Sequence, residues 1–185
     1  MLSWVLMNAV KVSKYLSRVL RHEPERIGIT LDDAGWVDVD VLLAACAARN
    51  FPVSRAQLDT VVAENDKQRF AFSADGTRIR ASQGHTVAVD LGLVELAPPE
   101  VLYHGTSPGS VAAILVEGLR PMRRHAVHLS TDVDTARRVG ARRGRPVVFV
   151  VRAGRMAAAG HVFHRSDNGV WLVDAVPPRF LQTRA

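Results

Sequence analysis

Residues 69–81 read RFAFSADGTRIRA, and this stretch predicts the fold of the first half of the chain. Polar and apolar side chains alternate along Arg69–Ser73 and again along Thr77–Ala81, as they do in a half-buried strand. Asp75-Gly76 between the two runs is typical of a tight hairpin turn. We therefore expect a β-hairpin that buries its phenylalanines on one face and presents Arg69 on the other.

Three helices are predicted upstream of this hairpin, from apolar periodicity and from capping residues. They cover Asn8–Arg21, a segment from Asp38 or Asp40 to about Arg49, and a segment from the capping box Ser54-x-x-Gln57 to about Glu64. Three helices followed by a hairpin is the order of a winged helix. That architecture usually docks on nucleic acid, although it also serves as a protein-interaction module.

A pair of prolines separates the two halves of the chain. The segment Leu96–Glu100 suits a short linker, so we expect lobes at residues 1–97 and 98–185. Short apolar runs alternate with helical stretches in the second lobe, which predicts a mixed α/β lobe with many short strands. The expected elements are a strand Val101–Tyr103 running into His104-Gly105-Thr106, a helix opening at Ser107-Pro108, a strand Ala126–Leu129, a helix from Thr131 or Asp132 to about Arg143, and strands Pro146–Val151 and Val170–Val173.

The composition is that of a folded chain without a membrane span. Of 185 residues, 48% are hydrophobic and 23% are charged, which is enough to bury a core. The longest apolar run, Val41–Ala48, is far shorter than the roughly 20 residues that cross a bilayer, so we expect no membrane partner. The single cysteine, Cys46, excludes an intrachain disulfide and a cysteine-rich metal site. These features favour a cytoplasmic protein.

The net charge of +6 is distributed unevenly. Residues 1–97 carry three Lys and eight Arg against twelve acidic residues, whereas residues 98–185 carry thirteen Arg, no Lys and six acidic residues. Arginine binds phosphate through two parallel hydrogen bonds, so an Arg-rich lobe suggests a phosphate-rich partner. Biased codon usage would give the same composition, and the sequence alone does not separate the two explanations.

Five groups of residues could carry chemistry, and each has a structural alternative. They are Arg21-His22, the hairpin arginines Arg69, Arg78 and Arg80, the segment Gln83-Gly84-His85-Thr86, the triplet His104-Gly105-Thr106, and the run Arg137–Arg145. Arg21-His22 either caps a helix on a solvated face or pairs a cation with a titratable imidazole. The glycine of His104-Gly105-Thr106 either makes a turn or lets a ligand approach the backbone. The arginines are explained equally well as solvated faces.

Several common enzyme signatures are absent from the sequence. It has no GxxxxGK[ST] phosphate loop, no HExxH zinc motif and no nucleophile elbow of the hydrolase kind. Cys46 falls within a predicted apolar helix, which makes it an unsuitable nucleophile. We therefore expect chemistry without a metal ion and without a cysteine nucleophile.

The order of the short blocks along the chain is more specific than any one block. They are Ser13-Lys14-Tyr15-Leu16-Ser17, Leu20-Arg21-His22, Gly35-Trp36-Val37, Asn65-Asp66-Lys67-Gln68-Arg69-Phe70, Gln83-Gly84-His85, Leu102-Tyr103-His104-Gly105-Thr106, Val127-His128-Leu129-Ser130, Val139-Gly140-Ala141-Arg142 and Asn168-Gly169-Val170-Trp171-Leu172. This series resembles the RNA 2′-phosphotransferase family, whose members use NAD to remove a splice-junction 2′-phosphate from tRNA. The resemblance runs from about Val12 to Pro178. It departs from the family at Arg143, where a histidine is expected.

The resemblance implies a fold and a set of site residues. The fold is α/β with two lobes, a winged-helix RNA lobe at residues 1–97 and an ADP-ribosyltransferase-like NAD lobe at residues 98–185. The implied catalytic residues are Arg21, His22, Arg69 and Arg142. The implied NAD-binding residues are His104, Gly105, Thr106, His128, Leu129 and Ser130. From the basic face of the first helix and the polar segment after the hairpin, we expect contacts to the RNA phosphate at Lys14, Arg18, Gln83, Gly84 and His85. Val170 stands where many protein ADP-ribosyltransferases carry a glutamate.

The resemblance also implies a reaction in two steps. The RNA 2′-phosphate attacks the anomeric carbon of the nicotinamide ribose, which releases nicotinamide and gives 2′-phospho-ADP-ribosyl RNA. The ribose 2″-hydroxyl then attacks phosphorus, which gives 2′-OH RNA and ADP-ribose 1″,2″-cyclic phosphate. The expected partners are RNA bearing a 2′-phosphate and NAD, and no metal ion is expected. The enzyme is expected to act as a monomer. Two alternatives stay open. One is an ADP-ribosyltransferase that modifies either terminal phosphates of nucleic acid or a protein, and the other is a winged-helix binding protein without activity.

Overall fold

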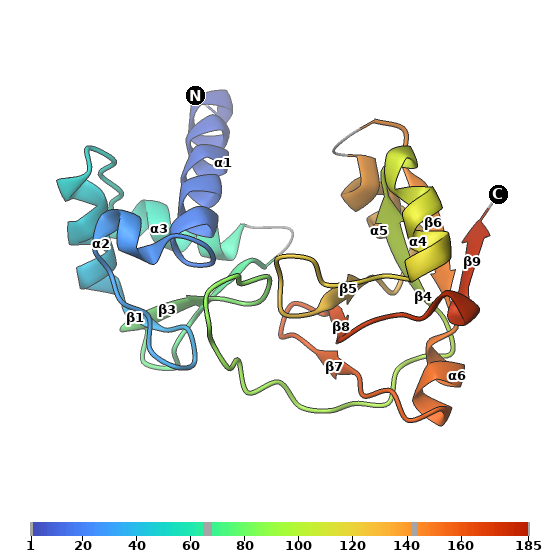
Figure 1. The fold of residues 1–185 in the computed structure, drawn as a ribbon. Helices are drawn as coiled ribbons and strands as arrows, with labels where there is room; N and C mark the ends of the chain where they lie inside the picture. Colours follow the sequence, from blue (N-terminus) through green and yellow to red (C-terminus); the bar gives the residue numbers. More distant parts are fainter. Residues whose placement is uncertain (1, 65–67, 142–143, 185) are drawn as a thin grey trace. The chain divides into compact units, whose positions relative to one another are not determined.

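A computed structural model describes residues 2–64, 68–141 and 144–184 of the chain. The chain divides into two compact units, residues 1–92 and 93–185, and each is described by itself (Figure 1). The boundary expected after residue 97, and the assignment of an RNA lobe and an NAD lobe to its two sides, stay predictions. The class is mixed α/β with small antiparallel sheets.

Three α-helices build the described part of the first unit, as the sequence predicts: α1 (Leu2–Val19), α2 (Val39–Ala48) and α3 (Arg55–Ala63). Helix α1 begins before the expected Asn8, because the apolar residues upstream continue the same helix. Asp38, rather than Asp40, caps α2 and accepts hydrogen bonds from two backbone N–H groups. The predicted capping box of α3 forms in both directions, between Ser54 and Gln57.

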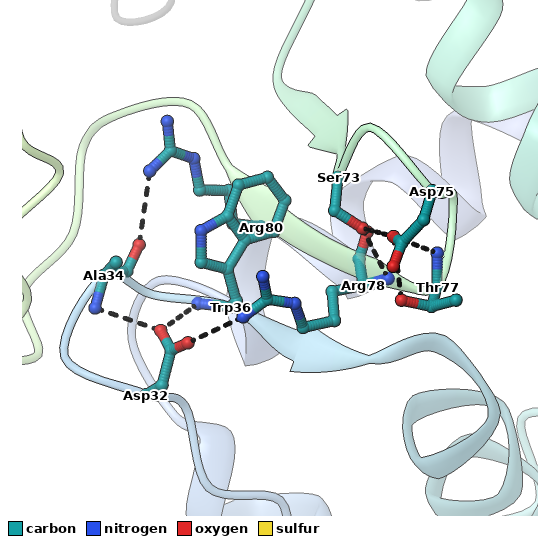
Figure 2. Close-up of polar contacts among 8 residues, drawn as sticks. All are labelled: Asp32, Ala34, Trp36, Ser73, Asp75, Thr77, Arg78 and Arg80. Atoms are coloured by element: carbon teal, nitrogen blue, oxygen red, sulfur yellow. Dashed lines mark hydrogen bonds and ion pairs between the residues drawn. The ribbon is translucent and has the colours of Figure 1, made fainter.

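The predicted hairpin is present in the first unit as strands β2 (Phe70–Phe72) and β3 (Arg78–Ala81). The carboxylate of Asp75 accepts hydrogen bonds from the Ser73 hydroxyl at 2.6 Å and from the Thr77 hydroxyl at 2.8 Å, which closes the turn (Figure 2). These bonds to the charged form lower the pKa of Asp75 to about 2. A third strand, β1 (Val37–Asp38), pairs with β3 on its other side, giving the order β1-β3-β2.

The core of the first unit joins helices α1, α2 and α3 to the sheet. Its fully buried side chains are Leu16, Val19, Leu20, Leu42, Cys46, Leu58, Ile79 and Ala81. Burial raises the pKa of the Cys46 thiol to about 11, which agrees with the expectation that this residue is no nucleophile. Within this core, helix α1 packs against helix α3.

Two three-stranded antiparallel sheets and three short helices build the described part of the second unit. The sheets are β4 (Leu102–Thr106), β6 (Val147–Val151) and β9 (Leu181–Arg184) in the order β4-β6-β9, and β5 (Val127–Leu129), β7 (His164–Arg165) and β8 (Trp171–Val173) in the order β5-β8-β7. The helices are α4 (Val111–Glu117), α5 (Val133–Gly140) and α6 (Ala153–Ala158). Strands β7 and β9 and helix α6 have no counterpart among the predicted elements, because short segments carry too little periodicity to be recognised.

His104-Gly105-Thr106 ends strand β4, as expected for a strand that runs into this triplet, and because all three residues pair with β6 the alternative of a turn is excluded. Two other expectations for the second unit need correction. The helix after β4 begins as a 3-10 turn over Pro108–Ser110, and Ser107 makes no side-chain capping bond there. Helix α5, capped by Asp132, ends at Gly140, ahead of the expected end near Arg143.

No helix in the described part of the chain combines the length and the apolar character that crossing a bilayer requires.

Candidate functional site

The carbonyl oxygen of Arg69 is a meeting point of three segments in the first unit. It accepts a hydrogen bond from Nη2 of Arg21 at 3.2 Å and another from the backbone N–H of Ser82 at 2.9 Å. The Ser82 hydroxyl also donates to the carbonyl of Gln68 at 2.8 Å. The guanidinium of Arg21 lies 6.0 Å from the centre of the Phe70 ring. The fold thus brings Arg21 and Arg69 together, although 48 residues separate them.

Thr86 connects the end of helix α1 to the segment that follows the hairpin. Its Oγ1 is 3.1 Å from Nδ1 of His22, and its backbone N–H donates to the carbonyl of Arg21 at 2.8 Å. Val87 donates to the same carbonyl at 3.3 Å. Because of these bonds, the predicted phosphate-binding segment Gln83-Gly84-His85 lies beside Arg21-His22. Thr86 belongs to the segment Gln83-Gly84-His85-Thr86 that the sequence marks as a candidate, but it is not among the predicted contacts to the RNA phosphate.

Three of the other predicted RNA contacts have distinct surroundings. Lys14 is exposed on α1. Arg18 makes two hydrogen bonds to the carboxylate of Glu23, at 2.8 and 2.9 Å, so an RNA phosphate would have to displace that carboxylate. His85 is only 3% exposed, and its ring packs against Gly35. In this structure His85 supports the segment from inside and does not present its ring to solvent.

The remaining hairpin arginines, Arg78 and Arg80, stack on a tryptophan (Figure 2). Their guanidinium carbons lie 5.6 Å and 4.5 Å from the Trp36 ring centre, respectively. Arg78 also pairs with the carboxylate of Asp32 at 3.4 Å, and Arg80 donates to the carbonyl of Ala34 at 3.5 Å. These contacts attach the hairpin to the turn before β1, which gives both arginines a structural role.

The two predicted NAD-binding blocks lie next to each other in the second unit. Tyr103 and Ser130 exchange two backbone hydrogen bonds, at 2.9 and 2.8 Å, which join the strand β4 block to the strand β5 block. Nδ1 of His104 is 3.0 Å from the carbonyl oxygen of His128. A carbonyl can only accept, so Nδ1 of His104 carries the proton and its Nε2 keeps a lone pair when the ring is neutral.

The electrostatics of this pair favour the neutral form of His104. Burial lowers its pKa below the usual histidine value and outweighs the opposing effect of the His128 carbonyl, while Arg124 lowers it further. Nη1 of Arg124 donates to Nδ1 of His128 at 3.4 Å. Arg124 is therefore a neighbour of the candidate site that the sequence analysis did not select. The side chain of Leu129, between the two polar residues of its block, is buried in the core.

Gly105 is required by helix packing. A Cβ on this residue would lie 1.7 Å from the carbonyl oxygen of Ala136, because helix α5 rests directly on strand β4. Gly140 makes the reciprocal contact, since a Cβ there would lie 2.8 Å from the backbone nitrogen of Thr106. The close approach of two backbones explains the glycine at position 105 by packing, and the assignment of Gly105 to NAD binding stays a prediction.

The fourth predicted catalytic residue, Arg142, lies outside the described residues, as do Arg143 and the block residues Asn65, Asp66 and Lys67. The arginines on α5 itself have partners on that helix: Arg137 pairs with Asp134 at 3.4 Å, and Arg138 donates to the Thr135 hydroxyl at 2.7 Å.

Val170 is half-buried at the end of a turn. The backbone N–H of Val170 donates to the hydroxyl oxygen of Ser166 at 3.2 Å. The carbonyl of Val170 accepts from the backbone N–H of Ser166 at 3.0 Å. Across residues 2–64, 68–141 and 144–184, no three His, Cys, Asp or Glu side chains cluster as a metal site would need. The absence of a metal ion from the reaction stays a prediction.

The comparison with known proteins agrees with the order of the sequence blocks. A family model described as RNA 2′-phosphotransferase, Tpt1 / KptA family, matches residues 7–175. Proteins named "Probable RNA 2′-phosphotransferase" are similar to this chain over nearly its whole length. The protein from Streptomyces coelicolor is 63% identical over 173 residues, which cover 94% of each chain. The protein from Streptomyces griseus is 64% identical over 182 residues, covering 95% of this chain and 96% of the relative. The protein from Nostoc punctiforme is 57% identical over 173 residues, covering 94% and 96%.

Proposed function

This chain belongs to the RNA 2′-phosphotransferase family and is therefore an enzyme, and from that membership we propose that it transfers an internal RNA 2′-phosphate to NAD. The products are 2′-OH RNA, nicotinamide and ADP-ribose 1″,2″-cyclic phosphate, and the intermediate is 2′-phospho-ADP-ribosyl RNA. The structural observation that supports the proposal is the proximity of Arg21, His22 and Arg69 in the first unit, linked through the Arg69 carbonyl and Thr86.

We assign the RNA to the first unit as a winged-helix lobe and NAD to the second as an ADP-ribosyltransferase-like lobe. Helices α1, α2 and α3 with the three-stranded sheet β1-β3-β2 support the first assignment. The adjacent blocks at His104 and Ser130 on short antiparallel strands support the second. A single cysteine, buried within α2, is in keeping with a cytoplasmic protein. We also propose that the enzyme acts as a monomer.

The first step needs positioning and neutralisation of charge. The RNA phosphate is already an anion and nicotinamide leaves as a neutral molecule, so neither a general base nor a general acid is required. Arg21, Arg69 and Arg142 are the residues that we propose to bind the phosphate oxygens. A valine at position 170, in place of a carboxylate, is compatible with this step because a carboxylate would repel the phosphate.

NAD binding in this proposal uses the second unit. With Nδ1–H of His104 engaged by the His128 carbonyl, Nε2 of His104 is an acceptor for a hydroxyl of the nicotinamide-side ribose. The lowered pKa of His104 keeps that acceptor unprotonated near neutral pH. Ser130 supplies a hydroxyl beside it, and the His128 ring is suited to stacking on nicotinamide.

The second step requires proton transfer, and His22 is the residue that we propose to perform it. The P–O bond to the ribose 2″-oxygen forms as the P–O bond to the RNA 2′-oxygen breaks. One proton leaves the attacking hydroxyl and one reaches the departing oxygen, so His22 can accept the first and deliver the second with no net change. His22 is exposed at the end of α1, where a large substrate can reach it.

The experiment that tests this function mixes the purified protein with NAD and an RNA that carries one internal 2′-phosphate. We expect nicotinamide release, loss of the 2′-phosphate and formation of ADP-ribose 1″,2″-cyclic phosphate. Parallel reactions with 5′- and 3′-terminal phosphates, and with a protein acceptor, separate the proposal from the alternative ADP-ribosyltransferase activities. ADP-ribosylation of a terminal phosphate or of protein, without loss of the internal 2′-phosphate, would contradict it.

The His22→Ala variant should impair the second step more than the first. Because only the second step needs proton transfer, 2′-phospho-ADP-ribosyl RNA should accumulate while nicotinamide is still released. A quenched time course with end-labelled RNA, resolved on a denaturing gel, measures the two species. If turnover falls and the intermediate never appears, the role proposed for His22 is wrong.

Turnover should persist in the presence of EDTA. The three guanidinium groups carry the charge neutralisation that Mg²⁺ provides in many other phosphoryl transfers. The measurement compares initial rates of 2′-phosphate loss before and after dialysis against EDTA, with added Mg²⁺ as the reversal control. A loss of activity that Mg²⁺ restores would contradict the metal-free reaction.

A further inference from the structure

The Thr86 hydroxyl is a direct neighbour of the imidazole that the proposed reaction uses. Its Oγ1 lies 3.1 Å from Nδ1 of His22, across 64 residues of sequence. Resting on the function proposed above, we infer that Thr86 is a positioning residue that holds His22 with a proton on Nδ1. Nε2 is then the nitrogen that accepts and returns the proton in the second step.

The position of Thr86 is fixed independently of its side chain. Its backbone N–H donates to the carbonyl of Arg21 at 2.8 Å, and Val87 donates to the same oxygen at 3.3 Å. Threonine is branched at Cβ, so χ1 has few alternatives once the backbone is set. The Thr86 hydroxyl is therefore held beside His22, where it limits rotation of the imidazole ring.

The inferred position of the imidazole proton follows from how the hydroxyl shares its hydrogen bonds. Thr86 has one hydroxyl proton, and in the proposed arrangement its acceptor is the carbonyl oxygen of Arg21, 3.4 Å from Oγ1. The same Oγ1 then accepts from Nδ1–H of His22. This arrangement also suits the imidazolium, in which both nitrogens carry a proton. Nε2 can thus gain and lose a proton without any change at Nδ1, as in other sites where a catalytic histidine is oriented through its second nitrogen.

Substitutions at Thr86 separate this role from a packing role. Thr86→Val keeps the branched shape and removes the hydroxyl, whereas Thr86→Ser keeps the hydroxyl. We expect Thr86→Val to slow the second step by about tenfold, a fraction of the gain that general acid–base catalysis provides, so that 2′-phospho-ADP-ribosyl RNA accumulates. Thr86→Ser should restore the rate of that step. Thr30→Val, at an exposed position of the first unit, is the matched control.

Nuclear magnetic resonance of the full-length protein tests the proton position without RNA or NAD. The imidazole ¹⁵N signals of His22 are identified by their loss in the His22→Asn variant. In wild-type protein with His22 neutral, the Nδ1 signal should be that of a protonated nitrogen. In Thr86→Val, the signals should shift toward the Nε2-protonated form that unconstrained imidazole prefers, and Thr86→Ser should resemble the wild type.

Specific results would overturn this inference. A neutral wild-type His22 that is protonated on Nε2 contradicts the proposed proton position, and this measurement needs no variant. A Thr86→Val protein with unchanged His22 signals, or with both steps slowed equally, assigns Thr86 to packing. Failure of the proposed function looks different, because wild-type protein would then show no loss of 2′-phosphate while the His22 spectra could still be measured.

Discussion

Arg69→Ala should lower the rate of 2′-phosphate transfer by about 100-fold or more, whereas Arg78→Ala should leave it within about twofold of the wild-type rate. The two arginines belong to the same hairpin region, yet their surroundings differ. The carbonyl of Arg69 joins Arg21 to Ser82, so the residue sits within the proposed phosphate-binding group. Arg78 pairs with Asp32 and stacks on Trp36, away from that group.

The substitution of Arg69 isolates its guanidinium from its structural role. The hydrogen bonds from Arg21 and Ser82 end on the backbone carbonyl of Arg69, which alanine retains. A loss of activity in an Arg69→Ala protein that stays folded therefore reports on the side chain of Arg69 and not on its carbonyl. In Arg78→Ala, the missing surface ion pair with Asp32 contributes at most about 1 kcal/mol to stability.

Single-turnover kinetics with an RNA carrying one internal 2′-phosphate measure the effect in both variants. Thermal unfolding of each variant shows whether the first unit is still folded. Equal losses of activity in Arg69→Ala and Arg78→Ala would show that the wrong residues of the hairpin have been assigned to the phosphate. A small loss in Arg69→Ala with an intact fold would remove it from the catalytic set.

Gly105→Ala should destabilise the second unit by about 3 kcal/mol or more, since overpacking against rigid backbone is among the costliest single substitutions. The new Cβ would lie 1.7 Å from the carbonyl oxygen of Ala136 and 2.6 Å from its carbonyl carbon. These are backbone atoms of α5, so no flexible side chain can move aside. The helix would have to leave strand β4, and the contact of Gly140 with Thr106 would be lost as well.

Gly109→Ala is the matched control, because no heavy atom lies within 4 Å of the Cβ it would add. It should change stability by no more than about 0.5 kcal/mol. Amide hydrogen exchange in strands β4 and β6 reports on the second unit alone, while exchange in α1 and α3 provides the internal reference. If the amides of β4 are equally protected from exchange in Gly105→Ala and Gly109→Ala, the close packing of α5 on β4 is wrong.

Local signals predicted the elements whose formation depends on neighbouring residues. The alternation around Asp75-Gly76 predicted the hairpin, and the side-chain bonds of Asp75 close it. The Ser54 capping box predicted the start of α3. The predictions were less accurate at helix ends: Arg21 and His22 follow α1 and lie outside it, and the Arg21 carbonyl accepts from Thr86 and Val87 instead of from a further helical turn.

The candidate site was predicted only as a set of separate blocks. The resemblance selected Arg21, His22 and Arg69, and the blocks at His104 and His128, without showing how members of a set meet. Arg18 and His85 were selected for their charge and sequence position, yet one is bonded to Glu23 and the other is buried against Gly35. Such partners are not visible in a local pattern, since a buried histidine and an exposed one have the same letter.

The sequence by itself determined the family and the local elements, because ordered blocks, capping residues and alternation act over a few neighbouring positions. The tertiary structure alone decided which of those residues touch. The bond from Arg21 to the Arg69 carbonyl spans 48 residues, and the contact between His22 and Thr86 spans 64. It also assigned Gly105 to the packing of α5 on β4. Contacts of this range depend on how complete helices and strands pack, so no short pattern in the chain encodes them.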